Sequence, residues 1–269
     1  MKILNEKIDR RKFIKIAGTG LTLFAFEGLL RKVNSEEIMP KKGKKRRYAM
    51  VIDLRRCIGC EACTIACKVE NNIPVDYSDN IGRKIFWNQV IFKEEGEYPY
   101  TDRKFWPRPC FHCEKPSCVK VCPVGATYID QERGLVLQRY ERCIGCRYCT
   151  VACPYGARYF NWSKPHWPKE MQDTFNPDVE KRYKGIVEKC TFCIHRIKKA
   201  EEKAKKENRE IKDGEIEPAC VLTCMGKARF FGDLNDPESE VSKLVRSGRA
   251  YRLEEYLGTE PKVFYLMEG

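Results

Sequence analysis

Sixteen cysteines constrain this chain more than any other feature of its sequence, because they form four groups of four with none left over. In chain order, motifs I to IV are Cys57, Cys60, Cys63, Cys67; Cys110, Cys113, Cys118, Cys122; Cys143, Cys146, Cys149, Cys153; and Cys190, Cys193, Cys220, Cys224. Motifs I and III have the spacing C-x2-C-x2-C-x3-C. Motif II widens one gap and motif IV contains a 26-residue insertion, but both keep the opening C-x2-C and the closing C-x3-C.

This spacing is typical of cubane iron–sulfur clusters. Three thiolates separated by two residues wrap a tight loop around three corners of one cluster, and the fourth cysteine points to a neighbouring cluster. Gly59 and Gly145 lie inside such loops, where a residue without a side chain lets backbone N–H groups approach the sulfides. Because no ligand is missing, we predict four [4Fe–4S] clusters.

Two other uses of cysteine fit the pattern less well. Zinc sites with four cysteines use pairs of C-x2-C, whereas motifs I and III are runs of three cysteines followed by x3-C. A disulfide framework would place its cysteines at irregular separations. We therefore expect iron and sulfide at these positions.

The chain also contains an internal repeat. The twelve residues 56–67 return as residues 142–153 with nine identities, and residues 116–126 are echoed by residues 218–228. Such repetition indicates the duplication of a unit that carries two motifs. We predict two ferredoxin-like modules with both helices and strands, an α+β fold with long aromatic insertions.

Loop length indicates which motifs share a module. Twenty residues separate Cys122 from Cys143, enough for a hairpin with strands at Thr127–Asp130 and Leu135–Gln138. Motifs II and III are therefore predicted to form one module, residues 110–153, while motifs I and IV form the other, residues 48–109 with 154–269. Sequential pairing of motif I with motif II is an alternative that spacing does not exclude.

In the nested arrangement each cluster takes three cysteines from one motif and the fourth from its partner motif. The predicted ligand sets are site 1, Cys57, Cys60, Cys63 and Cys224; site 2, Cys190, Cys193, Cys220 and Cys67; site 3, Cys110, Cys113, Cys118 and Cys153; and site 4, Cys143, Cys146, Cys149 and Cys122. Proline follows the last cysteine of motifs II and III, but Lys68 and Met225 take that place in motifs I and IV. Lys68 would raise the potential of the adjacent cluster, unless it is a solvated surface charge.

The N-terminal region predicts export. Arg10 and Arg11, followed by the uncharged stretch 16–26, form a twin-arginine signal within residues 1–35. Eleven uncharged residues are too few for a transmembrane helix. The twin-arginine route carries folded proteins, so clusters inserted in the cytoplasm would arrive protected in an oxidising compartment.

Charge and histidine content exclude other classes of function. Of the net charge of +13, residues 1–50 carry +9, so the basicity belongs to the signal region and the basic linker 36–47. We therefore expect no nucleic-acid partner. None of the three histidines has the neighbours that a catalytic base needs, although His112 and His195 lie close to cysteines. We expect no catalytic residues, only one-electron transfer.

The remaining segments predict ordinary elements. Residues 84–92 and 98–106 read as strands, 192–207 and 239–247 as helices, and 263–266 as a strand. Residues 160–189 read as an ordered irregular loop. Aromatic side chains in the two insertions either cap the modules or dock a partner, with candidate anchors at Trp87, Trp106, Trp162 and Trp167.

Taken together, the chain resembles the four-cluster iron–sulfur subunit of the dimethyl sulfoxide reductase family. The resemblance extends from about Tyr48 to Leu266 and includes Cys190-Thr-Phe-Cys-Ile-His-Arg-Ile197 and Phe231-Gly-Asp-Leu-Asn-Asp-Pro-Glu-Ser239. It implies the nested pairing of motifs. Pro154-Tyr-Gly-Ala-Arg-Tyr-Phe160, the signal and the lack of a membrane tail are similar to tetrathionate, polysulfide, arsenate and formate-dependent nitrite reductase systems. Met225 and Lys227 depart from the usual Cys-Pro-x-Gly-Ala.

The resemblance also implies partners: a catalytic subunit with a molybdenum or tungsten bis-pterin cofactor, and a membrane-embedded quinone-reactive subunit. The chain would then act on the periplasmic side of the cytoplasmic membrane as a peripheral electron-transfer subunit of a respiratory oxidoreductase. Two alternatives are the electron-transfer subunit of a periplasmic hydrogenase and a free polyferredoxin shuttle. The long insertions argue against the shuttle, because they exceed what cluster binding needs.

Overall fold

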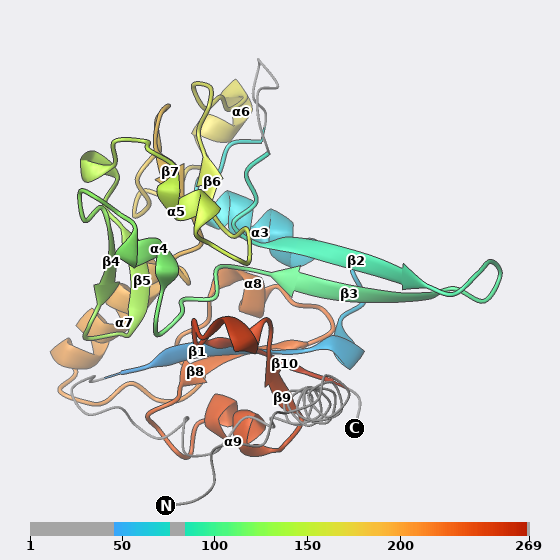
Figure 1. The fold of residues 1–269 in the computed structure, drawn as a ribbon. Helices are drawn as coiled ribbons and strands as arrows, with labels where there is room; N and C mark the ends of the chain where they lie inside the picture. Colours follow the sequence, from blue (N-terminus) through green and yellow to red (C-terminus); the bar gives the residue numbers. More distant parts are fainter. Residues whose placement is uncertain (1–45, 76–83, 268–269) are drawn as a thin grey trace, which may run out of the picture.

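A four-stranded sheet joins the two ends of the folded chain. The computed structural model describes residues 46–75 and 84–267. The sheet has the order β8-β1-β10-β9, in which β1 runs parallel to β10 and the other pairs are antiparallel (Figure 1). Its strands are β1 (Tyr48–Asp53), β8 (Arg229–Asp233), β9 (Ala250–Arg252) and β10 (Val263–Leu266).

Both faces of this sheet are covered. All six residues of β1 are buried. Met50 and Ile52 pack with the cysteines on one face, whereas Ala49 and Val51 pack against α9 (Glu240–Arg246) on the other. A strand covered on both sides has an unbroken apolar sequence. The run from Tyr48 to Ile52 is therefore explained by its central place in the sheet.

Short helices accompany the cysteine loops. Those that carry motif cysteines are α3 (Ala62–Glu70), α4 (Ser117–Lys120), α5 (Tyr148–Val151) and α8 (Ala219–Leu222). Helix α3 packs against α8, and α4 packs against α5. The remaining helical elements are α6 (Lys169–Gln172), α7 (Ile194–Lys206), η1 (Leu54–Arg56), η2 (Tyr140–Arg142) and η3 (Glu255–Leu257).

The internal repeat is visible in the backbone. A 3-10 turn precedes the first cysteine of motifs I and III, and α3 and α5 each begin after a residue in the left-handed region, Glu61 (φ 58°) and Arg147 (φ 64°). Helices α4 and α8 each begin directly after a proline, Pro116 and Pro218. The repeated sequences thus fold in the same way, and the mixture of helices and strands agrees with the predicted α+β class.

Three hairpins complete the fold. The predicted hairpin forms with the expected bounds, β4 (Thr127–Asp130) and β5 (Leu135–Gln138). In the first insertion, β2 (Gln89–Glu95) and β3 (Asp102–Arg108) pair from Gln89 to Glu95 and form an arm that projects from the body (Figure 1). The predicted strands 84–92 and 98–106 therefore began too early. The third hairpin joins β6 (Tyr159–Phe160) to β7 (Val187–Glu188), around the irregular loop that was predicted.

Other predicted elements are confirmed with small changes at their ends. Helix α7 begins at Ile194, because Phe192 and Cys193 have φ values of 55° and 52°. Ser239 is the N-cap of α9, and its side chain accepts a hydrogen bond from the backbone N–H of Ser242. Strand β10 has the predicted bounds.

The predicted twin-arginine signal, with Arg10 and Arg11, lies outside the described residues. Of the basic linker, the structure describes Arg46 and Arg47. Arg47 is buried, and its Nε donates to Glu114 Oε1 at 2.6 Å, so this end of the linker belongs to the folded body. Within residues 46–75 and 84–267, no helix has the length and apolar character needed to cross a membrane.

Candidate metal centres

Site 1 brings cysteines from both ends of the chain into one cavity. Cys57, Cys60, Cys63 and Cys224 all line it. The backbone N–H of Ala228 donates to Cys224 Sγ at 3.3 Å. Burial raises the pKa of Cys57, and the neighbouring thiols of Cys63 and Cys224 raise it further. Cys60 is exposed.

Site 2 is the most enclosed of the four, because all of its cysteines are buried. Burial raises the pKa of Cys67 well above its ordinary value, and the nearby thiols of Cys190, Cys193 and Cys220 add to the effect. The amide of Asn71 lies 3.7 Å from the sulfurs of both Cys67 and Cys193, so it joins motif I to motif IV. The backbone N–H of Phe192 donates to Cys190 Sγ at 3.4 Å.

Site 3 draws on motifs II and III. Burial raises the pKa of Cys113, and the thiols of Cys110, Cys118 and Cys153 contribute to the increase. All four predicted ligands therefore lie near one another. The guanidinium of Arg158 donates from Nη2 to Cys118 Sγ at 3.1 Å.

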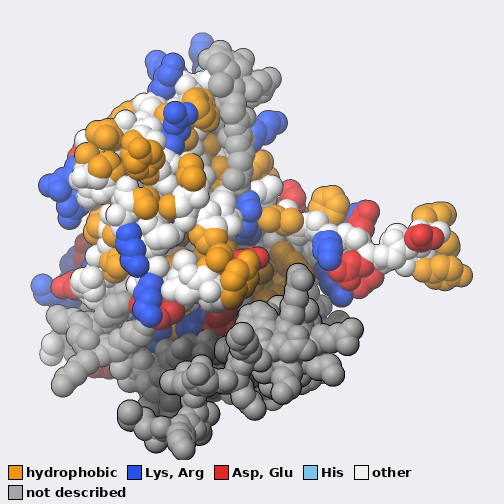
Figure 2. Space-filling model, viewed as in Figure 1, with side chains coloured by type: hydrophobic (Ala, Val, Ile, Leu, Met, Phe, Trp, Pro, Cys, Tyr) orange, Lys and Arg blue, Asp and Glu red, His pale blue; other side chains and the backbone are white. Residues whose placement is uncertain are grey.

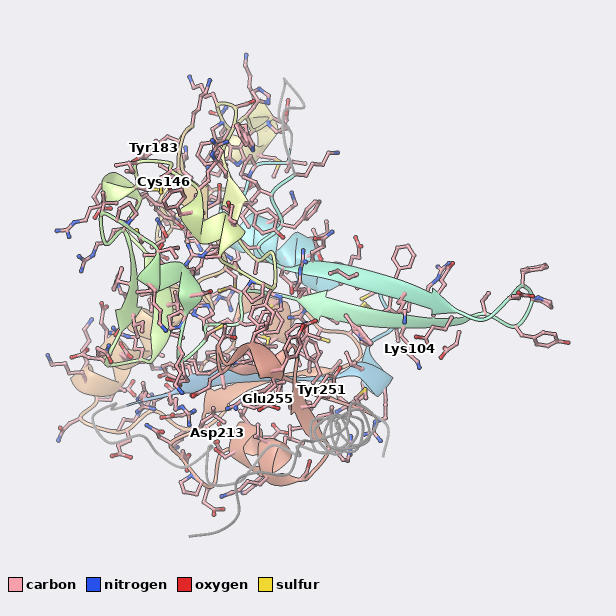
Figure 3. The ribbon with its side chains drawn as sticks, viewed as in Figure 1. Lys104, Cys146, Tyr183, Asp213, Tyr251 and Glu255 are labelled. Atoms are coloured by element: carbon pink, nitrogen blue, oxygen red, sulfur yellow. The ribbon has the colours of Figure 1, made fainter. Side chains whose placement is uncertain are left out.

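Site 4 lies in the outer part of the molecule, where Figure 3 shows Cys146 and Tyr183 away from the four-stranded sheet. Cys143 and Cys149 are close enough to interact electrostatically. Cys143 Sγ accepts from the N–H of Val187 at 3.5 Å. Burial raises the pKa of Cys122, but backbone N–H groups of residues 124, 126 and 127 outweigh it and lower the pKa overall.

These surroundings fit iron–sulfur clusters. The donors are thiols, and backbone N–H groups approach a sulfur at every site. Within the described residues, no three Cys, His, Asp or Glu side chains converge on a single metal ion. Cluster ligands bind four different iron atoms and do not need to meet at one point.

Only glycine fits at the two loop positions, because the backbone conformation disfavours other residues and neighbouring atoms leave no room for a Cβ. Gly59 and Gly145 have φ values of 70° and 71°, which favour glycine. A Cβ at Gly59 would overlap the ring of Phe105, in the middle of strand β3. A Cβ at Gly145 would overlap the backbone oxygen of Gly185. Both cysteine loops are therefore covered closely by the two insertions.

Thiols of neighbouring sites lie near enough to one another to interact electrostatically. Cys63 of site 1 interacts with Cys220 of site 2. Cys110 of site 3 interacts with Cys190 of site 2. Cys118 of site 3 interacts with Cys149 of site 4. The four sites therefore follow one another in the order 1, 2, 3, 4.

Several side chains that the sequence singled out have other partners. His195 Nε2 lies 2.6 Å from Glu70 Oε1, and His112 Nδ1 accepts from the N–H of Val136 at 3.2 Å. Lys68 Nζ donates to the backbone oxygen of Pro74 at 3.2 Å and lies 4.3 Å from the centroid of the Phe86 ring. Burial lowers the pKa of Lys68, so this side chain is not an ordinary solvated charge.

One candidate docking anchor is wrong. Trp87 is only 3% exposed, and its Nε1 donates to the buried carboxylate of Glu188 at 2.8 Å. Trp87 therefore belongs to the core. Trp162 remains exposed and forms an edge contact with Phe160 at 4.8 Å between centroids.

Sequence reasoning missed Asn71, Arg158 and Arg229 as neighbours of the cysteines. The two arginines had a detectable signal, because each follows the last cysteine of its motif by five residues within an Ala-Arg-aromatic-aromatic sequence. Asn71 had none, since its role depends on the approach of motif IV.

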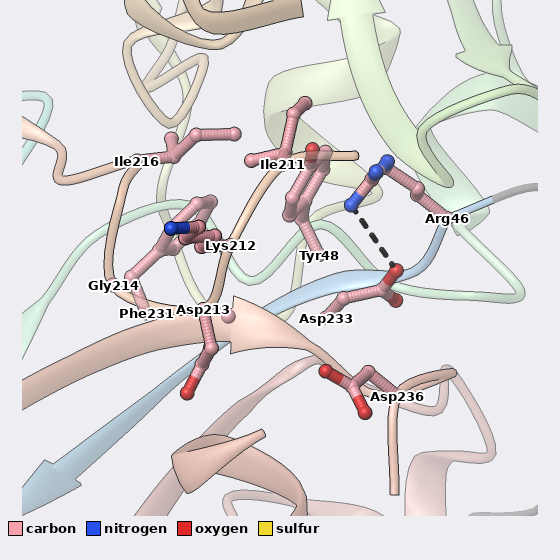
Figure 4. A pocket seen from close by; sticks show the side chains of 11 residues that line it. Arg46, Tyr48, Ile211, Lys212, Asp213, Gly214, Ile216, Phe231, Asp233 and Asp236 are labelled. Atoms are coloured by element: carbon pink, nitrogen blue, oxygen red, sulfur yellow. Dashed lines mark ion pairs between the residues drawn. The ribbon is translucent and has the colours of Figure 1, made fainter. Parts of the chain in front are cut away.

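A separate pocket contains no cysteine. It lies between loop 211–216 and the edge of the sheet formed by Tyr48, Phe231 and Asp233 (Figure 4). Asp233 accepts from the N–H of Arg47 at 2.7 Å and forms an ion pair with Arg46 at 3.9 Å. These contacts fix the entry of the chain into β1.

Comparison with known families agrees with the cysteine sites. Two family models, each described as a 4Fe-4S dicluster domain, match residues 56–126 and 101–171. Both matches include motif II, so by themselves they do not decide which motifs pair.

Relatives that match most of the chain are subunits of reductases. The chain is 49% identical to the menaquinone reductase iron–sulfur cluster-binding subunit of Nitratidesulfovibrio vulgaris, over 82% of this chain and 89% of the relative. It is 43% identical to a selenate reductase subunit of Mesobacillus selenatarsenatis, over 82% and 72%. It is 38% identical to the arsenate respiratory reductase iron–sulfur subunit of a Shewanella species, over 82% and 96%. The chain therefore belongs to the family of iron–sulfur subunits of dimethyl sulfoxide reductase-type complexes.

Proposed function

We propose that this chain holds four [4Fe–4S] clusters and relays single electrons between a membrane-embedded quinone-reactive subunit and a molybdopterin catalytic subunit. The relatives are subunits of respiratory reductases, which favours this function over the hydrogenase alternative. When bound, the clusters supply one-electron transfer. The chain itself contributes the thiols, the hydrogen bonds to them and the order of the sites.

The observation that carries the proposal is the series of electrostatic interactions between thiols of neighbouring sites, which links site 1 to site 2, site 2 to site 3 and site 3 to site 4. A protein that stores or carries electrons would not need its sites in one line. A relay does, because electrons must enter at one end and leave at the other.

The exposed ends of this line support the same function. Cys60 of site 1 and Cys146 of site 4 are the two exposed cysteines of the described chain. Exposed apolar side chains flank both, with Ile58 next to site 1 and Ile144 and Tyr148 next to site 4. Apolar surface beside an accessible redox site suits a partner interface. We therefore assign one partner to each end.

The finer features of the proposal follow from the sequence. The ligand sets of sites 1 to 4 are those of the nested pairing, with module boundaries at residues 48–109 with 154–269 and 110–153. Export by the twin-arginine pathway, read from Arg10 and Arg11, would place the chain on the periplasmic side of the membrane. The exposed cysteines then face one membrane partner and one periplasmic partner.

Metal analysis tests the number and kind of clusters. Chain purified without oxygen, together with its native subunits, should contain about 16 iron atoms and about 16 acid-labile sulfides per copy. A molybdopterin subunit should copurify, and a quinol analogue should reduce the clusters only when the membrane subunit is present.

Two results would contradict the proposal. Stoichiometric zinc without sulfide would show that the thiols form zinc sites. A fully loaded monomer from native membranes that exchanges electrons with many soluble carriers would identify a free shuttle.

A further inference from the structure

Two buried arginines occupy equivalent positions in the repeat. Arg158 and Arg229 each follow the last cysteine of their motif, Cys153 and Cys224, by five residues. Each is only 4% exposed. Motifs I and II have the neutral residues Asn72 and Thr127 at this position, so each predicted two-cluster module contains one such arginine.

Arg229 lies between sites 1 and 2. Its Nη2 donates to Cys63 Sγ of site 1 at 3.4 Å and to Asn88 Oδ1 at 2.8 Å, while Nη1 lies 3.5 Å from Met50 Sδ. The thiols that interact most strongly with its charge belong to both sites: Cys220 of site 2, and Cys63 and Cys224 of site 1.

Arg158 lies between sites 3 and 4 in the same manner. Its Nη2 donates to Cys118 Sγ of site 3 at 3.1 Å, and Nη1 lies 3.2 Å from both Thr127 Oγ1 and Gln138 Oε1. Its charge interacts with Cys118 and Cys110 of site 3 and with Cys149 of site 4.

The charge of these arginines needs an anionic partner. In the described part of the chain, neither guanidinium forms an ion pair with a carboxylate, and the oxygens that it contacts are neutral. Burial of an unpaired charge is costly, and buried arginines are normally paired. Thiolates and the clusters that they bind are anionic, so they supply the missing counter-charge.

We propose that Arg158 and Arg229 set the reduction potentials of the clusters in their own modules. Each holds one positive charge between two sites, where it stabilises the negative charge that an incoming electron adds to either of them. The step moves one electron onto a site and later off it, and the arginine keeps its proton throughout. The inference rests on the proposed function, because it requires bound clusters.

Substitution by glutamine and by lysine separates charge from packing. Arg229→Gln keeps a hydrogen-bond donor but removes the charge, whereas Arg229→Lys keeps the charge. In a redox titration of the anaerobically purified complex followed by EPR, the glutamine variant should lower two of the four potentials. We expect a change of at least tenfold in the equilibrium constant for reduction, which is about 59 mV for one electron.

The two arginines should act on different clusters. Arg158→Gln should lower the two potentials that Arg229→Gln leaves unchanged. The lysine variants should remain close to wild type. Exposed cations serve as controls, because solvent screens them: Arg139→Gln and Lys227→Gln should leave all four potentials near their wild-type values.

The outcomes are distinct. Wild-type potentials in a loaded glutamine variant would overturn the proposal, as would equal shifts in the lysine and glutamine variants. If only the glutamine variants lose iron, the charge serves to hold the clusters rather than to set their potentials, and the proposal fails. If the lysine variants lose iron too, the arginines act through packing and the proposal fails. Absence of iron and sulfide from the wild type would instead refute the proposed function.

Discussion

The fourth cysteine of each motif determines which clusters share a module. For motif I this residue is Cys67, which lies among the thiols of Cys190, Cys193 and Cys220 in the structure. The carboxamide of Asn71 contacts the sulfurs of both Cys67 and Cys193, so these two residues from distant parts of the sequence have a common polar partner. Sequential pairing would instead require Cys67 beside Cys110, Cys113 and Cys118.

Serine substitutions test this arrangement. Cys67→Ser and Cys193→Ser should perturb the same EPR signal, because both remove a thiolate from site 2, and the affected cluster should become labile or lose one iron. Cys113→Ser is the matched control and should perturb a different signal, that of site 3. If Cys67→Ser and Cys113→Ser altered the same signal, sequential pairing would be correct.

At this scale, spacing identified the cysteines but not the polar groups around them. A C-x2-C-x2-C loop can be recognised locally, because its geometry depends on a few consecutive residues. The contacts of Arg229 with Met50 and Asn88 join residues more than 140 positions apart in the chain, and no local pattern encodes them. The duplicated Ala-Arg-aromatic-aromatic sequence was the available signal, and its meaning depended on knowing which sites lie beside it.

Among the elements, the β2–β3 arm projects from the body of the molecule (Figure 1). Only the base of the arm, with Val90 and Pro107, is buried, while the outer half is exposed. Tyr98 and Tyr100 in the connecting loop are 92% and 89% exposed. Figure 2 shows hydrophobic side chains gathered at this tip. Because Phe105 in the middle of β3 covers the Gly59 loop, the arm adjoins site 1.

The arm should therefore bind the partner at the site 1 end. The double substitution Tyr98→Ser with Tyr100→Ser should reduce copurification of that partner by at least tenfold, because exposed tyrosines are typical anchors in protein interfaces. Iron and sulfide content should stay unchanged. Lys104→Ala is the control on the same arm (Figure 3), since its ion pairs with Glu95 and Asp102 are exposed and are screened by solvent. Retention of the partner by the tyrosine variant would show that the arm has another role.

The ends of this arm show why element boundaries are harder to predict than element types. The β-branched and aromatic residues of 84–92 favoured a strand, but Ile85 and Trp87 are buried in the core and the ladder begins only at Gln89. Because the side chains of Ile85 and Trp87 pack in the core, this part of the chain does not pair in the hairpin. The β4–β5 hairpin had the predicted bounds because its short turn fixes the register locally.

For the molecule as a whole, the line of sites implies unequal protection from solvent. Sites 1 and 4 each have one exposed cysteine, Cys60 and Cys146, whereas all four cysteines of site 2 are buried. Site 3 has one buried and three partly buried cysteines. The insertions cover the loops of motifs I and III, but they leave these two cysteines accessible. The outer clusters are therefore more open to attack than the inner ones.

Removal of iron by a chelator should reveal this order. In the isolated, loaded chain we expect two phases of iron release, with about half of the iron lost in the fast phase, because a chelator reaches exposed thiolate ligands first. EPR spectra taken during the reaction should lose two signals before the other two. Binding of the catalytic subunit should slow the loss of one of the fast signals, since the partner covers that end of the line.

Chain unfolded in denaturant is the control and should release all of its iron in one phase. A single phase in the folded chain, with all four signals falling together, would mean that cysteine exposure does not determine the stability of the clusters.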